Sequence, residues 1–556
     1  MLRRPVLREE HAWRIAVGLA ASVVAIPIAV VLLTASGQTE GVWAHLWQTR
    51  LAGYATNSAL LAMVSCSVAF LLGIVPAWLL TSHRVPGAPV LERMMLLPLA
   101  VPPYVCAYAY SDLLQFSGPL QSGLRDATGW SRGEYWFPEV RSVWGAGLIL
   151  AVSLTPYVFV AARQAFAAQA SYSLVVARTL GASRAKRLLG IALPLARPAI
   201  LGGVLLVFLE TIADFGVADY CAVDTLTTGI YRSWYGLDSP PTAARISVLL
   251  LAGIAGVVFL ASLLRRGSDT TESAAAEPPR RTGLGHTRGV LAAAACFMPI
   301  VLGFVLPTAV FAKLLMSSSL RLGFDYVVEA GQNSLLIGFL AAMGAVILAV
   351  VVVTAKRACR SPIVTATSRI ALLGYGVPGP VIAVGLLVPL TMLDRWINHA
   401  ASFLLGSDGR PGLILTGSIF AVLLGCQTRF LAVAASTVNA SFGRVRASLD
   451  HAARTLGAGP LSTLLRIHLP VCAPGLIAAM FLVFADVVKE LPMTLMLRPF
   501  NFDTLAVRTY QLVHDERLEE ASASALAMII TGLVPVVLVS ALATNRRKLA
   551  RGISHE

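Results

Sequence analysis

Long apolar stretches of about 20 residues alternate with short polar segments along the whole chain. A helix of that length crosses the hydrocarbon core of a bilayer. Hydropathy therefore predicts about twelve spanning helices, and the fold class is an all-α polytopic membrane protein. Six are expected in the first half, at 13–33, 55–80, 94–114, 143–166, 198–217 and 244–264. Six more are expected in the second half, at 290–315, 334–355, 370–393, 413–435, 473–488 and 522–543.

The composition agrees with this prediction and argues against a soluble enzyme. Hydrophobic residues make up 56% of the 556-residue chain and charged residues only 13%, whereas soluble domains carry about a quarter charged residues. The net charge of +15 comes from Lys and Arg residues that gather in alternate loops between the apolar stretches. This is the positive-inside pattern, so we expect both termini in the cytoplasm, a lipid bilayer around the chain and no nucleic-acid partner.

Residues that could carry chemistry are scattered. The seven Cys residues contain no Cys-x-x-Cys pair and the nine His residues no His-x-x-x-His pair, so we expect no disulfide framework and no metal site. No constellation of Ser, His and acidic residues suggests a nucleophile with its base. The absence of any Gly-Lys dipeptide excludes the usual phosphate-binding lysine of an ATPase. We expect no catalytic residues, no cofactor bound by this chain and no enzymatic activity of its own.

One stretch of sequence occurs twice. Residues 177–182, Ala-Arg-Thr-Leu-Gly-Ala, recur as residues 453–458, and 454 − 178 gives an offset of 276. The same offset carries Asn57-Ser58 onto Asn333-Ser334. Six predicted helices lie between the two copies, an even number, so the halves have the same orientation. They should be related by a pseudo-twofold axis along the membrane normal.

A polar segment separates the two repeats. Residues 268–288 contain Ser, Thr, Glu, Ala and Pro and then Arg, which is typical of a flexible connector. We expect a first repeat over 1–267, a cytoplasmic linker over 268–288 and a second repeat over 289–556.

The repeated stretch predicts a helical elbow in each half, within residues 171–197 and 447–473. Gly181 and Gly457 each stand between a helix-forming stretch and an amphipathic stretch that ends in Leu-Pro. Glycine lets the backbone turn there at low steric cost, and proline closes the second helix or begins the next span. A single loop of this kind is held by its own packing, but two matched copies suggest docking sites for two identical partners. The docking residues are Ala177, Arg178, Thr179, Leu180, Gly181 and Ala182 in the first elbow and Ala453, Arg454, Thr455, Leu456, Gly457 and Ala458 in the second.

The elbows resemble the cytoplasmic signature of permease subunits of binding-protein-dependent ABC importers, which is Glu-Ala-Ala, three residues, Gly, nine residues and Ile-x-Leu-Pro. Gly181 to Ile191-Ala192-Leu193-Pro194 and Gly457 to Ile467-His468-Leu469-Pro470 keep this spacing, although the acidic residue is missing from both opening triplets. The resemblance implies a type I ABC importer permease fold in a bacterial inner membrane, with each elbow a coupling helix. It also implies two copies of an ABC ATPase, which would bind ATP and Mg²⁺, and a periplasmic or surface-tethered substrate-binding protein.

Several segments are similar to fused ferric-iron importer permeases, among them 135–139, 209–216, 489–494 and 498–506. The implied function is ferric-iron import by alternating access. Fused thiamine and phosphonate permeases are relatives of the same kind, so those cargoes stay open. An ion-coupled secondary transporter is a weaker alternative, because it would have no reason to keep two elbows of one spacing.

Four carboxylates indicate a polar pathway. Glu210 and Asp214 lie four residues apart, hence on one helical face, and the offset of 276 carries them onto Asp486 and Glu490. Charged side chains inside a membrane are costly and usually line a pathway, and carboxylate oxygens suit a hard cation. We expect transient guidance of the cargo and not a tight cage. The alternative is that the four cap span ends or pair with Lys489 and Arg508.

Two further features leave alternatives open. Pro102-Pro103 and Pro378 interrupt the third and ninth predicted helices, either as hinges or as tolerated kinks. The segment 117–141 carries several aromatic residues and is expected outside the cell. It either touches a binding protein or lies at the membrane interface as an aromatic belt.

Overall fold

The structure is a computed structural model, and it describes residues 3–131, 133–169, 179–265, 281–317, 324–359, 361–405 and 411–552. Within these ranges, 11 helices are long and apolar enough to cross a membrane, or up to 12 if one bent pair of helices counts as a single span. Most are apolar around their whole circumference, as expected of helices that face lipid on one side and protein on the other. The predicted all-α polytopic fold is confirmed.

The spans follow the predicted order. Those of the first repeat are α1 (Arg3–Thr34), α3 (Leu51–Ser82), the pair α4 (Ala88–Met94) and α5 (Pro103–Leu114), α7 (Val143–Gln169), α10 (Leu193–Ala213) and α13 (Pro240–Arg265). Those of the second are α14 (His286–Ile300) continued by α15 (Leu306–Ser317), α16 (Phe324–Ala358), α18 (Gly379–Leu405), α19 (Ile419–Phe442), α22 (Leu469–Val488) and α25 (Leu518–Gly552).

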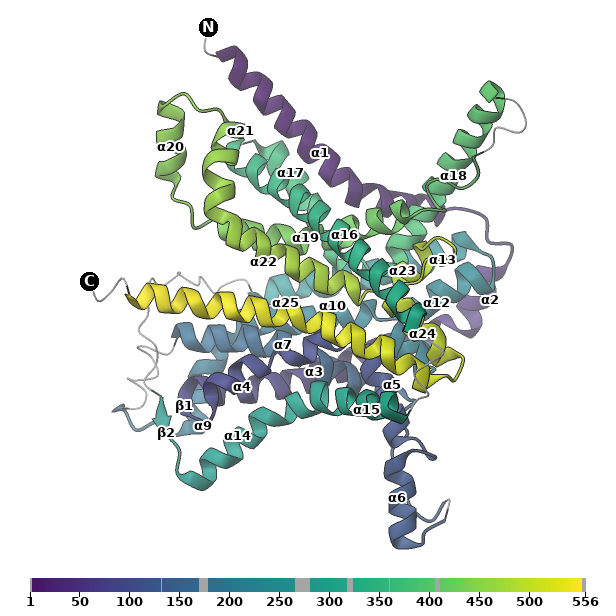
Figure 1. The fold of residues 1–556 in the computed structure, drawn as a ribbon, viewed down its shortest axis with the longest axis vertical. Helices are drawn as coiled ribbons and strands as arrows, with labels where there is room; N and C mark the ends of the chain where they lie inside the picture. The colour runs from purple at the N-terminus through teal and green to yellow at the C-terminus, as the bar shows by residue number, and fades with distance from the viewer. Residues whose placement is uncertain are drawn as a thin grey trace.

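Shorter elements connect the spans at the two ends of the bundle. The end that we call the elbow side lies on the left in Figure 1 and carries β1 (His83–Arg84), α9 (Arg184–Arg187), β2 (Thr282–Gly283), α17 (Pro362–Ala371), α20 (Ala447–Thr455) and α21 (Pro460–Thr463). The opposite end, the mouth side, carries α2 (Val42–Thr49), α6 (Pro119–Thr128), α12 (Leu226–Tyr231) and α24 (Leu505–His514). Two further short helices, α11 (Gly216–Tyr220) and α23 (Pro492–Leu497), follow α10 and α22. Single 3-10 or π turns complete the chain at η1 (Leu97–Ala100), η2 (Leu188–Ala192), η3 (Arg232–Gly236), η4 (Val301–Val305), η5 (Gly374–Gly376) and η6 (Leu464–His468).

The third span of each repeat is broken at the expected prolines. In the first repeat the helical segments on the two sides of Val101-Pro102 meet at 89°, and in the second α18 begins directly after Pro378. Proline cannot donate the next helical hydrogen bond, and its ring disfavours helical geometry in the residue before it. The predicted interruption of the third and ninth spans at Pro102-Pro103 and Pro378 is therefore confirmed: a new helix begins after the proline at both places.

The first span of each repeat packs on the other repeat. Helix α1 contacts α16, α17, α18 and α19, whereas α14 contacts α3 and α4 and α15 contacts α5. Figure 1 shows the purple α1 beside green helices of the second repeat, and α14 and α15 below the purple and blue helices of the first. The two sequence repeats thus interlock, and neither forms a complete packing unit alone.

The end of the expected linker is ordered. Strand β2 pairs in parallel with β1, with Thr282 opposite His83. Arg281 forms an ion pair of 2.9 Å with Glu92, and α14 already begins at His286. Residues 266–280 lie outside the described residues.

Glycines let helices of the bundle approach closely. A Cβ atom added to Gly73 of α3 would lie 2.8 Å from Cβ of Val158, and one added to Gly147 of α7 would lie 2.7 Å from Cγ1 of Val64. Small residues at such contacts are the usual means of packing helices in lipid, where the hydrophobic effect between helices is absent.

We predict that Gly73→Val destabilises the protein by roughly 1–3 kcal/mol, because the added methyl groups overpack the contact between α3 and α7. Thermal unfolding in detergent micelles measures the change. Gly253→Val on α13 is the matched control, since a Cβ atom there meets nothing within 4 Å. Equal losses in both variants would contradict the close contact.

Candidate functional site

A small polar cavity lies between the two repeats. Its volume is about 90 Å³. All four carboxylates singled out in the sequence line it, together with two cations that come from the second repeat. These charged residues are Glu210, Asp214, Asp486, Glu490, Arg429 and Lys489. We call this space the central cavity.

Two of the four carboxylates sit at breaks between helices. Helix α10 ends at Ala213, so Asp214 follows the helix and does not belong to it. Its carboxylate accepts hydrogen bonds from the backbone N–H groups of Val217 (2.9 Å) and Ala218 (3.3 Å) in α11. The prediction that Glu210 and Asp214 share one helical face is therefore wrong. The Asp214 carboxylate satisfies free N–H groups in the first turn of the next helix.

Glu490 repeats this arrangement in the second half. It lies beyond the end of α22 at Val488, and its carboxylate accepts from the backbone N–H groups of Met493 (3.0 Å) and Thr494 (2.9 Å) in α23. The offset of 276 relates Glu490 to Asp214, Met493 to Val217 and Thr494 to Ala218, so the same hydrogen bonds form in both repeats. Backbone polar groups inside a bilayer need internal partners, so the carboxylates stabilise two breaks that would otherwise be unfavourable.

Arg429 connects the two repeats across the central cavity. Its guanidinium lies 3.2 Å from Oε1 of Glu490 and 3.7 Å from Oε2 of Glu210, and the residue is 8% exposed. The hydroxyl of Tyr375 donates to Oε1 of Glu210 over 2.5 Å. Glu210 belongs to the first repeat and Arg429 and Tyr375 to the second, so these contacts hold the halves together at the centre.

The cations of the cavity break the symmetry of the repeats. Arg429 corresponds to Ser153, since 429 − 276 = 153, and Lys489 corresponds to Ala213, since 489 − 276 = 213. Lys489 lies 2.9 Å from Oδ1 of Asp486, which agrees with one of the pairings considered from the sequence. Arg429 was missed, although a single charge within an otherwise uncharged span was a usable signal.

A larger cavity continues from the centre towards the elbow side. Its volume is about 810 Å³. It shares Tyr157, Asp486 and Lys489 with the central cavity and reaches Lys356 and Asn439, near the elbow-side ends of α16 and α19. The path through the bundle is therefore wider on the elbow side than at its centre.

The two elbows have matching turns. Gly181 and Gly457 both have a φ of +79°, a left-handed conformation that glycine adopts without strain. Next to them, Leu180 is 80% exposed and Leu456 is 87% exposed. The other predicted residues of both elbows are exposed or partly exposed except Ala453, which is buried. Ala177 and Arg178 lie outside the described residues. The Leu-Pro pairs begin α10 and α22.

The second elbow is tied to the bundle by a buried aspartate. Asp450 of α20 accepts from Arg357 at the end of α16 (2.7 Å) and is bonded to the ring of His468 (2.8 Å). Burial opposes ionisation, but the hydrogen bonds from Arg357 and His468 hold the pKa of the Asp450 carboxyl below its usual range. Movement of α20 can therefore be passed directly to α16.

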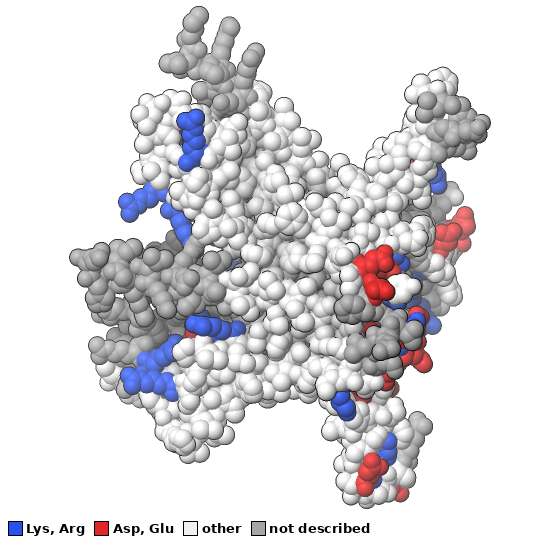
Figure 2. Space-filling view, in the orientation of Figure 1, with Lys and Arg blue, Asp and Glu red and all other residues white. Residues whose placement is uncertain are grey.

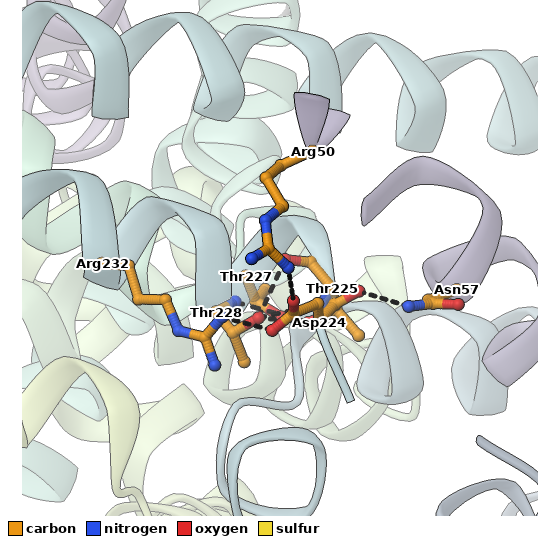
Figure 3. A network of polar contacts seen from close by, with 7 residues as sticks. All are labelled: Arg50, Asn57, Asp224, Thr225, Thr227, Thr228 and Arg232. Carbon is orange, nitrogen blue, oxygen red and sulfur yellow. Dashed lines mark hydrogen bonds and ion pairs between the residues drawn. The ribbon is translucent and has the colours of Figure 1, made fainter. Parts of the chain in front are cut away.

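A second set of repeated hydrogen bonds lies at the mouth side. Figure 3 shows the carboxylate of Asp224 between Arg50 and Arg232, and the side chain of Asn57 directed at the Asp224 carbonyl oxygen, 2.9 Å away. Asn333 donates in the same way to the carbonyl oxygen of Asp503 (3.1 Å). Both aspartates begin the sequence Asp-Thr-Leu, at an offset of 503 − 224 = 279. The hydroxyls of Ser58 and Ser334 accept from the backbone N–H groups of Leu226 (3.0 Å) and Leu505 (2.8 Å). The repeated Asn-Ser pairs therefore fix the starts of α12 and α24.

Two interlocked helical repeats around a polar cavity, with paired elbows at one end, form the architecture of a membrane permease. The family model "Binding-protein-dependent transport system inner membrane component" matches residues 69–268 and 352–549. The chain belongs to this family and contains its domain twice. It is a multi-pass ABC transporter permease, and the suspected resemblance is confirmed.

Individual relatives differ in cargo. The chain is 26% identical over 531 residues to the Fe(3+)-transport system permease protein FbpB 2 of Haemophilus influenzae. The aligned region covers 92% of this chain and 95% of that protein. It is 34% identical over 215 residues to a probable molybdenum ABC transporter permease of Haloferax volcanii, covering 38% and 74%. It is 25% identical over 223 residues to the sulfate transport system permease protein CysT of Escherichia coli, covering 38% and 77%.

We predict that Arg429→Gln lowers stability by about 3–5 kcal/mol, because it leaves the buried Glu490 and the partly buried Glu210 without their cation. Adding Glu490→Gln should recover much of this loss. Thermal unfolding of the purified protein measures both changes, and Arg369→Gln at an exposed position of α17 is the control. A loss in Arg429→Gln no larger than in the control would show that the cross-repeat contact is unimportant.

Proposed function

We propose that this permease imports ferric iron, taking it from a binding protein at the mouth side and releasing it at the elbow side. The observation that carries the proposal is the central cavity, where four carboxylates face two cations at the interface of the repeats. Hard oxygen donors in excess of positive charge favour a hard cation. The ferric-iron permease that resembles the chain over 92% of its length supports the same cargo.

The surface charge is consistent with a cationic cargo. Figure 2 shows Lys and Arg towards the elbow side and a concentration of Asp and Glu at the mouth side. Exposed acidic residues there include Asp325, Glu329, Asp515, Glu516, Glu519 and Glu520. An acidic mouth raises the local concentration of cations and speeds their arrival. The basic end corresponds to the cytoplasm by the positive-inside rule.

Import would proceed by alternating access driven by two ATPase subunits. The exposed leucines Leu180 and Leu456 are the natural anchors for a cleft on each ATPase, since burying a leucine contributes about 1.5–3 kcal/mol. Closure of the ATPase pair would draw the elbows together. Because Asp450 links α20 to α16, that motion would reach the helices around the cavity. The chain then needs no ATP, Mg²⁺ or other cofactor of its own.

An oxyanion is the second candidate cargo. Arg429 and Lys489 line the central cavity, and two relatives that each match about one repeat carry names for molybdenum and sulfate transport. Both cations, however, are paired with carboxylates. Thiamine and phosphonates remain as further cargoes to be tested.

We predict that restoring the chain to cells that lack it restores uptake of radioactive ferric iron and not of molybdate, sulfate, thiamine or a phosphonate. Glu210→Gln and Asp486→Asn should each reduce iron uptake at least about tenfold, equivalent to ~1.4 kcal/mol. Arg369→Gln, which removes a charge at an exposed position of α17 away from the central cavity and the mouth, is the control. Restored uptake of molybdate or sulfate without iron would replace the ferric assignment by the oxyanion one.

We predict that Leu180→Glu and Leu456→Glu together abolish ATP-driven uptake and reduce co-purification of the ATPase at least about tenfold, because a charge replaces each apolar anchor. Leu404→Glu, an equally drastic change at an exposed position of the mouth side, should leave co-purification unchanged. Uptake that survives the double substitution at normal protein levels would show that the two elbow leucines do not anchor the ATPase.

A further inference from the structure

A third cavity, with a different set of side chains, lies at the mouth side. Its volume is about 610 Å³, and it has no lining residue in common with the central cavity. The walls come from α11 and α12 of the first repeat and from α24 of the second. The lining residues are Asp219, Tyr231, Arg232, Arg508, Tyr510, Gln511, His514 and Asp515.

Two side chains converge in this cavity on one carboxylate oxygen of Asp219. The Tyr510 hydroxyl donates to Oδ2 of Asp219 over 2.8 Å, and Nε2 of His514 lies 3.4 Å from the same oxygen. Tyr510 and His514 are four residues apart on α24, and their ring centroids lie 4.5 Å apart. Metal–ligand bonds of about 2.0–2.2 Å at angles of 90–109° place neighbouring ligand atoms about 2.8–3.5 Å apart. Both measured distances fall in that range.

The cluster is accessible and is not occupied by a neighbouring cation. The His514 side chain is 47% exposed and that of Asp219 is 17% exposed. Of the two arginines in the wall, Arg232 is paired with Asp224 and Arg508 lies over the ring of Tyr326. Burial and the Asp219 carboxylate raise the pKa of the Tyr510 phenol above its usual value, so the phenol keeps its proton while the site is empty.

We propose that Asp219, Tyr510 and His514 form a mouth site that accepts the ferric cargo before it reaches the central cavity. Carboxylate and phenolate oxygens are hard donors, and imidazole also binds iron. On binding, Tyr510 loses its proton to water, an iron–phenolate bond forms, and a donor atom of the delivering ligand leaves the iron. This proposal rests on the ferric assignment made above.

The position of the site suggests how it releases its cargo. Asp219 belongs to the first repeat, whereas Tyr510 and His514 belong to the second. Separation of the repeats at the mouth would therefore remove one of three ligands and weaken binding. Asp214 precedes the five-residue helix α11 that holds Asp219, and it lines the central cavity. Opening would thus favour transfer from Asp219 towards Asp214.

The experiment is a titration of the purified full-length permease with ferric nitrilotriacetate, followed by the visible absorption of iron–phenolate coordination. We expect the absorption band in the unchanged protein and its loss in Tyr510→Phe. Asp219→Asn and His514→Gln should weaken binding at least about tenfold. Tyr235→Phe is the matched control: it also removes a phenol near the mouth, but its hydroxyl donates to the Met496 carbonyl oxygen, outside the cluster.

Each outcome decides the proposal. No band in the unchanged protein, or a band that persists in Tyr510→Phe, would overturn the mouth site. Loss of the band in Tyr231→Phe with retention in Tyr510→Phe would also overturn it. Variants are compared after size-exclusion chromatography, so that misfolded protein is excluded. If cells take up iron but the purified protein shows no absorption band, the proposed function stands and the mouth site is removed. If the purified protein shows the band but cells do not take up iron, the mouth site is supported and the proposed function is contradicted.

Discussion

Charges and free backbone groups in the interior of this bundle must satisfy one another, because lipid offers them no partners. The two breaks that follow α10 and α22 illustrate this constraint. Each exposes N–H groups in the first turn of a short helix, and a carboxylate, Asp214 or Glu490, accepts from them. Glu490 is in turn paired with Arg429, which also faces Glu210 of the other repeat. Glu490, Arg429 and Glu210 are therefore connected across the interface of the two repeats.

The two repeats share the same breaks, turns and hydrogen bonds but differ in the charged residues that they place in the central cavity. Both have a broken third span, a carboxylate at the break after the fifth span, a glycine elbow and an Asn-Ser pair that fixes a helix at the mouth. Both cations that line the central cavity, Arg429 and Lys489, come from the second repeat. Duplication therefore supplies the scaffold twice, whereas the charges around the central cavity differ between the copies. This asymmetry is available to a single fused chain, in which each half can change independently.

Interlocking of the repeats makes the fused chain one mechanical unit. Since α1 packs on the second repeat and α14 and α15 on the first, neither half can move without carrying a helix of the other. The elbows lie at one end of this unit, and the contacts between Asp219 and α24 lie at the other. A change at the elbow side can reach the mouth through rigid spans, and the contacts of Arg429 at the centre are the natural pivot.

The sequence by itself determined the spanning helices, the duplication, the elbows and the four carboxylates as a set. These signals are local or repeat at a fixed offset, as with Gly181 and Gly457, so that no knowledge of long-range contacts is needed. Only the tertiary structure decided that Asp214 lies beyond its helix, that α1 packs on the opposite repeat, and that Arg429 lies between Glu210 and Glu490. Only the tertiary structure shows that Asp219 lies next to Tyr510 and His514. Such contacts join residues far apart in sequence, and hydropathy and spacing carry no information about which buried charge finds which partner.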